Sequence, residues 1–539
     1  MVASVSRWVA AAAIAASIAP SPANAPAAAT AKYFTSIRAD PPRLRAFLND
    51  MPKGGDLHNH LSGSIYAESY ASFAAADGLC VNVATMALLP PPCVAALGIP
   101  PASTTFADPT MLNAFIDGVS MRHWPREKNG HDHFFDAFAK FSAASGPPGD
   151  RFAARIGEMI AEVSARAADE RVSYLELMLT PDGGAAAAAG ASAGWNPDLA
   201  ALRATLLAAD FAGVVVRSAR QNLERAEARR KELLHCGDDG RSAEASRYET
   251  SGRDDTEASR YDTSRRYEPS RRSDQSRSAK ASAERGCDVT IRYVAQVPRS
   301  ASPQVVFAQM LAAFLEASAG DLPIVGVNMV APEDNPVALR DFRLHMSMLE
   351  YLRKEYPSVR ISLHAGELTG GLVPPEALRF HIRESVEIAG AARIGHGVDV
   401  MYEDDAPELL REMAAKHVLV EIALTSNDLI LGVAGKRHPL SAYLRAGVPV
   451  AIVTDDAGVS RSSETDEFQK AVEDQGLDYP TLKELARNSI EYAFADQATK
   501  ARLRRDLEAA FTAFEKLQTS RLRDRGVRGR TPNGATGRP

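Results

Sequence analysis

Several apolar, β-branched stretches of this chain end abruptly in histidine or carboxylate side chains. Residues 359–363 lead into His364 and, three residues later, Glu367. Another stretch carries His396 between two glycines, and a third ends in the adjacent carboxylates Asp455 and Asp456. A neutral imidazole suits a zinc-class metal, and a carboxylate beside it can move protons. Each stretch alone also fits a core histidine or a helix N-cap, so the prediction depends on their recurrence.

A fourth stretch, residues 55–63, holds two histidines at positions 58 and 60. Residues two apart on a strand face the same side, so one metal can take both imidazoles. A buried pair of carboxylates with no cation would be costly. We therefore predict one ion with four ligands, His58, His60, His364 and Asp455. His396 and Glu367 then remain for proton transfer, and Asp456 for substrate recognition.

Eight strand-like stretches, most of them separated by helical ones, must position these residues. Five of them are residues 172–178, 289–295, 323–329, 359–363 and 416–424, and the other three lead into His58, His396 and Asp455. Strands that alternate with helices indicate a parallel sheet, and eight such units indicate a closed barrel with its chemistry at the C-terminal strand ends. We predict an α/β fold, a (β/α)8 TIM-type barrel. It has an N-terminal extension, a lid insertion after strand 1 and a disordered insertion before strand 3.

The polar strand ends resemble the motifs of the adenosine deaminase family, in the same order along the chain. The matches are Leu57-His58-Asn59-His60-Leu61, His364-Ala365-Gly366-Glu367, Gly395-His396-Gly397, Glu421-Ile422-Ala423-Leu424-Thr425-Ser426-Asn427 and Thr454-Asp455-Asp456. The resemblance spans roughly residues 51–495 apart from one insertion. Residues 51–55 and 327–334 look more like the secreted, growth-factor-related branch than the short cytosolic enzymes.

The resemblance implies hydrolytic deamination of adenosine or 2′-deoxyadenosine, with release of ammonia and with one Zn²⁺ as cofactor. His396 would orient the attacking water and take its proton, and Glu367 would donate a proton to purine N1. Asp455 would also hold the attacking oxygen, and Asp456 would bond near purine N7. The backbone of Ala331, where the family often has glycine, would meet the purine. Ser62 stands where the short enzymes carry an aspartate that meets the ribose.

Residues 1–31 have the pattern of a secretory signal peptide, with Arg7 before a short apolar run. Ala29-Thr30-Ala31 is the favoured cleavage site, ahead of Ala23-Asn24-Ala25, and an uncleaved anchor is the alternative. We expect a secreted or periplasmic protein that has no membrane segment after cleavage. The deaminase barrel is assigned to residues 32–517 and a disordered tail to 518–539. Helical residues 33–50 would cover the barrel bottom or contact another subunit, which makes a homodimer one expectation.

Two insertions interrupt the barrel pattern. Residues 80–150 are expected to be an irregular lid over the nucleoside pocket, with His131 and His133 as lid residues rather than a second metal pair. Residues 237–286 are rich in Ser, Arg, Asp and Glu, and predict a disordered low-complexity insertion within the barrel. A binding arm for nucleic acid or polysaccharide is the alternative. Four cysteines allow three pairings; we favour Cys80–Cys93 and Cys236–Cys287, with free thiols as the alternative.

Composition limits the partners of the chain. It has 539 residues, is 45% hydrophobic and has a net charge of −6, which supports a large core and does not suggest a nucleic-acid binder. The expected partner is a small-molecule purine nucleoside. The alternatives are a deaminase of another aminopurine, such as adenine or a modified nucleoside, and a non-catalytic extracellular binding protein on the same scaffold. A phosphoesterase or an amidase is a further enzyme class to which such a site could belong.

Overall fold

Eight parallel strands form the centre of the computed structural model, which describes residues 25–125, 128–147, 149–237 and 285–528. Neighbouring strands hydrogen-bond in the order β1 (Gly54–His60), β4 (Val172–Leu179), β5 (Thr290–Pro298), β6 (Ile324–Val330), β7 (Arg360–Ala365), β8 (Arg393–His396), β9 (Leu419–Ile422) and β10 (Val450–Ile452). The sheet closes where the backbone N–H of Asp455 donates to His58 O (2.9 Å) and that of His60 donates to Asp455 O (3.1 Å). The predicted (β/α)8 barrel is confirmed.

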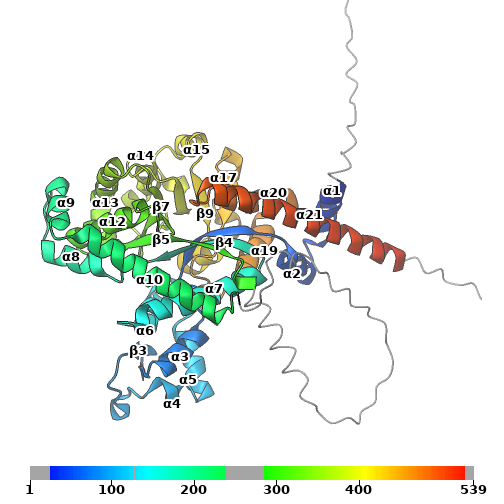
Figure 1. Cartoon of the computed structure of the whole chain (residues 1–539). Helices are drawn as coiled ribbons and strands as arrows, with labels where there is room; N and C mark the ends of the chain where they lie inside the picture. Colours follow the sequence, from blue (N-terminus) through cyan, green and yellow to red (C-terminus); the bar gives the residue numbers. More distant parts are fainter. Residues whose placement is uncertain (1–24, 126–127, 148, 238–284, 529–539) are drawn as a thin grey trace, which may run out of the picture.

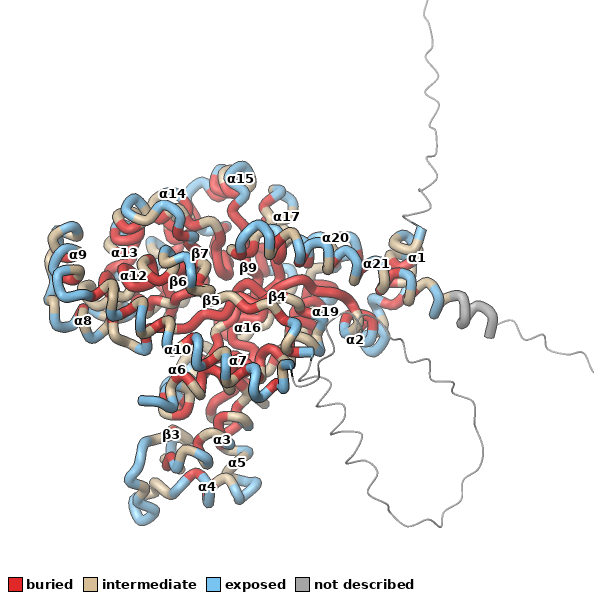
Figure 2. Tube along the Cα trace, in the orientation of Figure 1, coloured by how far each residue is buried: buried red, intermediate tan, exposed pale blue. Residues whose placement is uncertain are grey.

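Several of the strands are short apolar runs that are buried on both faces, as in other parallel sheets covered by helices. All residues of β9 and β10 are buried, and Figure 2 shows the strands as the most buried part of the molecule. Glu421 is a charged residue within such a run, at 1% exposure. A buried charge is tolerated only where it is paired, so its position in β9 marks a polar centre inside the barrel.

Helices cover the barrel on the outside (Figure 1). They are α7 (Arg151–Asp169), α8 (Ala185–Ala193), α9 (Leu199–Leu207), α10 (Phe211–Leu233), α12 (Pro303–Ser318), α13 (Pro336–Glu355), α14 (His381–Glu387), α15 (Ala406–Ala415), α16 (Leu424–Leu431), α17 (Leu440–Ala446), α18 (Ala457–Ser460), α19 (Glu464–Gln475) and α20 (Tyr479–Glu491). Short 3₁₀ turns are η2 (Ala95–Leu97), η3 (Pro375–Arg379), η4 (Val400–Tyr402) and η5 (Gly435–Arg437). No single described helix is long and apolar enough to span a membrane; α9 and α10 pass such a test together, bent by 67°.

The insertion after β1 is not the irregular segment that the sequence predicted. Residues 80–150 fold into β2 (Cys80–Asn82), β3 (Ala87–Leu89), α4 (Ala102–Thr105), α5 (Pro109–Gly118) and α6 (His131–Ser145). Together with the preceding α3 (Ala67–Ala76) they form a lobe below the barrel in Figure 1. Its aromatic residues pack together, with Tyr70 stacked on Phe141 at 4.4 Å between ring centroids. The sequence shows no regular period here because these helices are short and their apolar residues meet only in the folded lobe.

Both ends of the barrel unit differ from the predicted boundaries. α1 (Ala25–Ile37) and α2 (Pro41–Asp50) pack against the C-terminal helices, including α21 (Gln497–Arg528). The favoured cleavage after Ala31 would cut α1, in which buried Thr30 donates to Glu515 O (3.5 Å). Cleavage after Ala25 would leave the rest of α1 whole. The predicted start of a disordered tail at residue 518 is wrong, because α21 continues to Arg528 and Gln518 is 3% exposed.

Nearly all of the predicted low-complexity insertion lies outside the described residues, which stop at 237 and resume at 285. The Cys236–Cys287 disulfide joins the two ends of this segment, and Cys80–Cys93 closes a loop in the lobe after β1. Both favoured pairings are therefore confirmed and the alternative of free thiols is wrong. The segment connects α10 to the N-terminal end of β5, so its attachment points lie at the barrel end opposite the polar strand ends.

Candidate metal and active site

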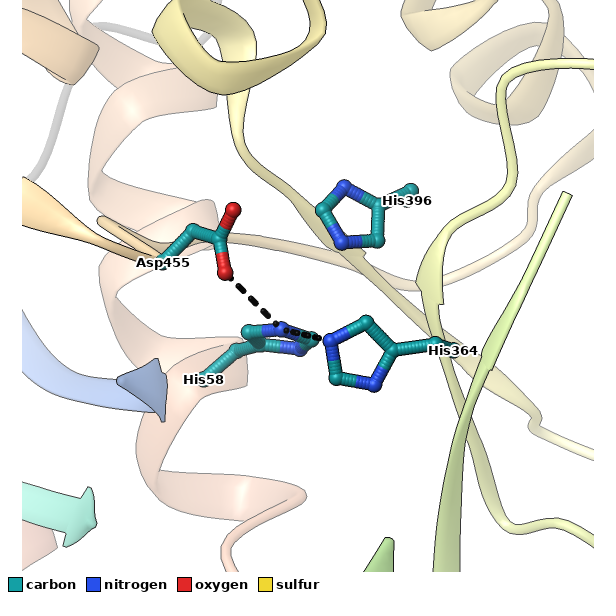
Figure 3. A group of neighbouring side chains, drawn as sticks. All are labelled: His58, His364, His396 and Asp455. Atoms are coloured by element: carbon teal, nitrogen blue, oxygen red, sulfur yellow. Dashed lines mark hydrogen bonds and ion pairs between the residues drawn. The ribbon is translucent and has the colours of Figure 1, made fainter. Parts of the chain in front are cut away.

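Four side-chain atoms converge where the barrel closes. His364 Nε2 lies 3.0 Å from both His58 Nε2 and His60 Nε2. Asp455 Oδ1 lies 3.4 Å from His58 Nε2 and 3.3 Å from His60 Nε2. In Figure 3, the side chains of His58, His364 and Asp455 reach from separate strands toward one point, with His396 beside them. The structure thus brings together the four residues predicted as ligands.

This donor set fits a zinc-class cation. Zinc ligands lie about 2.0–2.1 Å from the ion, so tetrahedral ligands are roughly 3.4 Å from one another. Burial lowers the pKa of His60 to about 4 and holds that of His364 well below its usual value, so both imidazoles are neutral and offer a lone pair. Imidazole lone pairs and a carboxylate oxygen at these separations fit the ligands of a single cation.

Hydrogen bonds behind two of the ligands hold their rings in the metal-binding tautomer. His58 Nδ1 lies 2.7 Å from Glu421 Oε2, and His364 Nδ1 lies 2.8 Å from Asn328 Oδ1. Asn328 Oδ1 also accepts the backbone N–H of His364 (3.2 Å), so it is the oxygen of the amide that faces the ring. An acceptor behind Nδ1 places the proton there and leaves the Nε2 lone pair for the ion.

Sharp turns at the strand ends aim these groups into one pocket. His396, Asp455 and Ala331 have φ values of +69°, +62° and +82°, which side chains other than glycine rarely adopt. Arg299 holds two strand ends in place, since its Nε donates to Ala331 O (2.9 Å) and its Nη1 to His364 O (3.1 Å). The strain at these residues is therefore offset by buried contacts at the site.

Glu367 lies at the floor of the pocket as an acid. Burial and the charge of Asp455 raise the pKa of its carboxyl to about 8, so it carries a proton at neutral pH. Its Oε1 lies 3.7 Å from His396 Nε2. Glu333 accepts the backbone N–H of Glu367 (2.8 Å) and is paired with His381 Nδ1 (2.6 Å), which holds the turn after β7. A protonated carboxyl in this position can donate to a ring nitrogen of a ligand.

The two adjacent aspartates differ in protonation. Burial opposes ionisation of Asp455, but a hydrogen bond to His58 and nearby imidazoles lower its pKa. Burial and the charge of Asp455 raise the pKa of Asp456 well above its usual value. Asp456 fits here because residue 63 is glycine: a Cβ on Gly63 would lie 1.6 Å from Asp456 Oδ1. The pair therefore offers one anionic oxygen to a cation and one neutral carboxyl to a ligand.

A cavity of about 290 Å³ opens over these residues. Its lining includes every predicted site residue except His58, which lies behind the others, and adds residues from the lid and neighbouring strands: Phe134, Phe135, Phe138, Gln296, Pro298, Val330, Pro332 and Ile430. The three phenylalanines come from α6, so this helix is the part of the insertion that covers the site. His131 at its start lies 3.0 Å from Asp334 Oδ1, and His133 lies 3.0 Å from Ser120 O; neither belongs to a metal cluster among the described residues.

Comparison with known proteins agrees with this geometry. Residues 260–510 match the family model for adenosine deaminase. The matched part of the chain, which holds β5 to β10, thus resembles the adenosine deaminase family. An adenine deaminase from Chelativorans sp. is 38% identical over 145 residues, which is 26% of this chain and 41% of that protein. An adenosine deaminase from Shewanella loihica is 35% identical over 143 residues, 26% of this chain and 40% of that protein.

The chain thus spans about two fifths of the length of these two curated adenosine deaminase family relatives. Among solved structures, an amidohydrolase from Burkholderia ambifaria with bound Zn has a TM-score of 0.52 at 15% identity. The structural match covers 88% of this chain and 94% of the Burkholderia chain. This likeness shows that the two chains share the barrel fold. The secreted branch of the adenosine deaminase family is not distinguished by these matches and remains an expectation.

The sequence analysis did not identify several residues that build this site. They are Glu421 and Asn328 behind the ligands, Glu333 and Arg299 behind the strand ends, and Phe134, Phe135 and Phe138 in the lid. Glu421 could have been identified from the sequence, because it is a single acidic residue within an apolar strand. The lid phenylalanines had none, because their place over the cavity depends on how the insertion folds.

Proposed function

We propose that the chain is a hydrolase that removes the 6-amino group of adenosine and 2′-deoxyadenosine, giving inosine and 2′-deoxyinosine and releasing ammonia. The observation that carries the proposal is the placement of a protonated Glu367 within the same pocket as the four converging ligand atoms. When bound there, one zinc-class ion would activate a water molecule for attack at purine C6.

The side chains of the pocket would perform the remaining steps. Attack at C6 pushes electrons onto ring N1, and Glu367 donates its proton there. His396 lies beside Glu367 and orients the attacking water. Asp456, neutral because burial and the charge of Asp455 raise its pKa, donates to N7, which is an acceptor. The carboxylate of Asp455 takes one proton of the attacking water and passes it to the amino group, which leaves as ammonia. The remaining hydroxyl proton returns to Glu367 as the 6-oxo product forms.

The pocket walls support an unphosphorylated substrate. Phe134, Phe135 and Phe138 form an apolar surface on the lid side, where the sugar would lie and from which water is excluded. None of the described residues lining the cavity is Lys or Arg, and its floor is acidic, so a 5′-phosphate would meet no cationic side chain there. Ser62 and Ala331 line the cavity as polar and backbone contacts for the nucleoside.

Adenine is the second candidate substrate, favoured by the 38% identity to an adenine deaminase over 145 residues. The change in near-ultraviolet absorbance on mixing the zinc-loaded protein with adenosine, 2′-deoxyadenosine, adenine or AMP separates these cases, with ammonia measured in parallel. We expect kcat/KM for adenosine to exceed that for adenine and AMP. Faster turnover of adenine would assign the second function, and no ammonia from any aminopurine would support a binding protein instead.

We also propose that the protein is exported to the periplasm or outside the cell. The two disulfides support this, because such bonds persist mainly in oxidising compartments. Detection of the protein in the periplasmic or culture fraction, with a free N-terminus near residue 26 or 32, would test it. A homodimer remains an expectation that sedimentation at several protein concentrations can examine.

A further inference from the structure

A chain of three hydrogen bonds runs behind His396, away from the pocket. The backbone N–H of Leu440 donates to His438 Nδ1 (3.2 Å). His438 Nε2 lies 3.0 Å from Asn427 Oδ1, and Asn427 Nδ2 lies 2.9 Å from His396 Nδ1. All three side chains are at most 3% exposed, so water does not compete for these bonds. The chain starts at a backbone amide, which can only donate.

The direction of every bond follows from that first donor. His438 Nδ1 accepts a hydrogen bond, so this ring must carry its proton on Nε2 and donate it to Asn427 Oδ1. With its oxygen used in this way, Asn427 presents its NH₂ group to His396. His396 Nδ1 must therefore accept, which excludes both the Nδ1–H tautomer and the imidazolium form of His396. The one remaining proton is on Nε2.

The same logic separates His396 from the neighbouring histidines. His58 and His364 have acceptors behind Nδ1, a glutamate carboxylate and an asparagine oxygen, which leave their Nε2 lone pairs free. His396 has a donor behind Nδ1, although one of its ring nitrogens lies within 4.8 Å of ligand atoms of His58, His364 and Asp455. Its Nε2 is buried, has no hydrogen-bond partner among the described residues and lies 3.7 Å from Glu367 Oε1.

We propose that His438 and Asn427 are positioning residues that hold His396 as the Nε2–H tautomer. His396 is then a hydrogen-bond donor at the reacting centre, and it is neither a metal ligand nor the group that accepts the proton of the attacking water. This revises the role expected for His396 from the resemblance. The donor can orient the water through an oxygen lone pair and stabilise the oxygen that becomes bonded to C6. The consequence for catalysis rests on the proposed function, whereas the tautomer does not.

Long-range ¹H–¹⁵N correlation spectra of the zinc-loaded protein, labelled with ¹⁵N-histidine, report the tautomer directly. The His396 signals are assigned by their loss in His396→Asn. We expect an unprotonated, pyridine-type Nδ1 and a protonated, pyrrole-type Nε2. Asn427→Asp presents only acceptors at almost the same size, so we expect the two signal types of His396 to exchange. A protonated Nδ1 in the parent protein, or an unchanged pattern in Asn427→Asp, would overturn the proposal.

A second pair of variants keeps the test valid if Asn427→Asp does not fold. His438→Gln retains an N–H donor toward Asn427 and should preserve the His396 pattern, whereas His438→Leu removes that donor and should give a mixture. With the deaminase substrate, we expect kcat to fall about 100-fold in Asn427→Asp with KM changed little, as for loss of one donor to a reacting oxygen. Asp428→Asn, on the same helix and paired with Lys470, is the control. If no substrate is turned over, the spectra still decide the tautomer of His396. Equal spectra for His438→Gln and His438→Leu would refute the proposed role of His438.

Discussion

The carboxylate of Glu421 connects the metal site to the barrel core, and Glu421→Gln tests that connection. Glu421 Oε2 lies 2.7 Å from His58 Nδ1, while Oε1 lies 2.6 Å from Arg393 Nε. Arg393 Nε is not aligned for a hydrogen bond, so the second contact is electrostatic. Glutamine has the same shape and keeps an oxygen for His58, but it removes the charge that strengthens both contacts.

Two effects of different size follow from this change. Replacing the carboxylate partner of a metal-bound histidine typically lowers metal affinity about 10–100-fold, or about 1.4–2.7 kcal/mol. Breaking a buried ion pair costs about 3–5 kcal/mol. Arg393 keeps its contact with Glu176 (2.5 Å), so we expect a loss of about 2 kcal/mol in the free energy of unfolding of the metal-free protein.

The matched control is Glu176→Gln, which removes the other carboxylate from Arg393 without touching a metal ligand. Zinc affinity is measured by competition with a chromogenic chelator, and stability by urea unfolding of the metal-free proteins. We expect both variants to lose stability and only Glu421→Gln to lose zinc affinity. Parent-like zinc affinity in Glu421→Gln, or an equal loss in Glu176→Gln, would refute the reasoning about His58.

Three further outcomes follow from the described contacts. Because Glu367 must be protonated to donate, kcat/KM should fall as the pH rises toward and through about 8. A bound cation would lower the pKa of Glu367 and so shift this fall to lower pH. Activity that rises up to pH 9 would contradict this expectation. Ala331→Gly relieves a φ of +82° and should stabilise the protein by about 1 kcal/mol in urea unfolding, whereas a lower midpoint would show that the Ala331 methyl group is needed. Asp334→Asn breaks the His131–Asp334 pair between the lid and the loop after β6, which is worth about 1 kcal/mol. KM should therefore rise about 5-fold with little change in kcat, and an unchanged KM would mean that the pair does not hold the lid.

Much of the barrel could be predicted from the sequence because its signals are local. A parallel strand that is buried on both faces shows as a short run of apolar residues, and the strands before His364 and Asp455 show this pattern. The spacing of His58 and His60 is also local, since the two-residue period of a strand places both rings on one side. Chain ends were less predictable: Gln518 is held in α21 by packing that its neighbours in the sequence do not reveal.

The lid and the groups behind the ligands depended on contacts between distant parts of the chain. Phe134, Phe135 and Phe138 reach the pocket only because the lobe after β1 folds and packs against the barrel, with which it shares one hydrophobic core. Glu421 reaches His58 across 363 residues of sequence, and no periodic pattern encodes such a pair.

The sequence by itself therefore determined which residue types could bind a cation and which strand ends would present them. Only the tertiary structure decided which acceptor or donor lies behind each imidazole. A histidine is the same residue in all four positions, and its role as ligand or donor depends on where its proton sits. For His58, His364 and His396, the partner of Nδ1 sets the position of the proton, and each partner comes from another element of the fold.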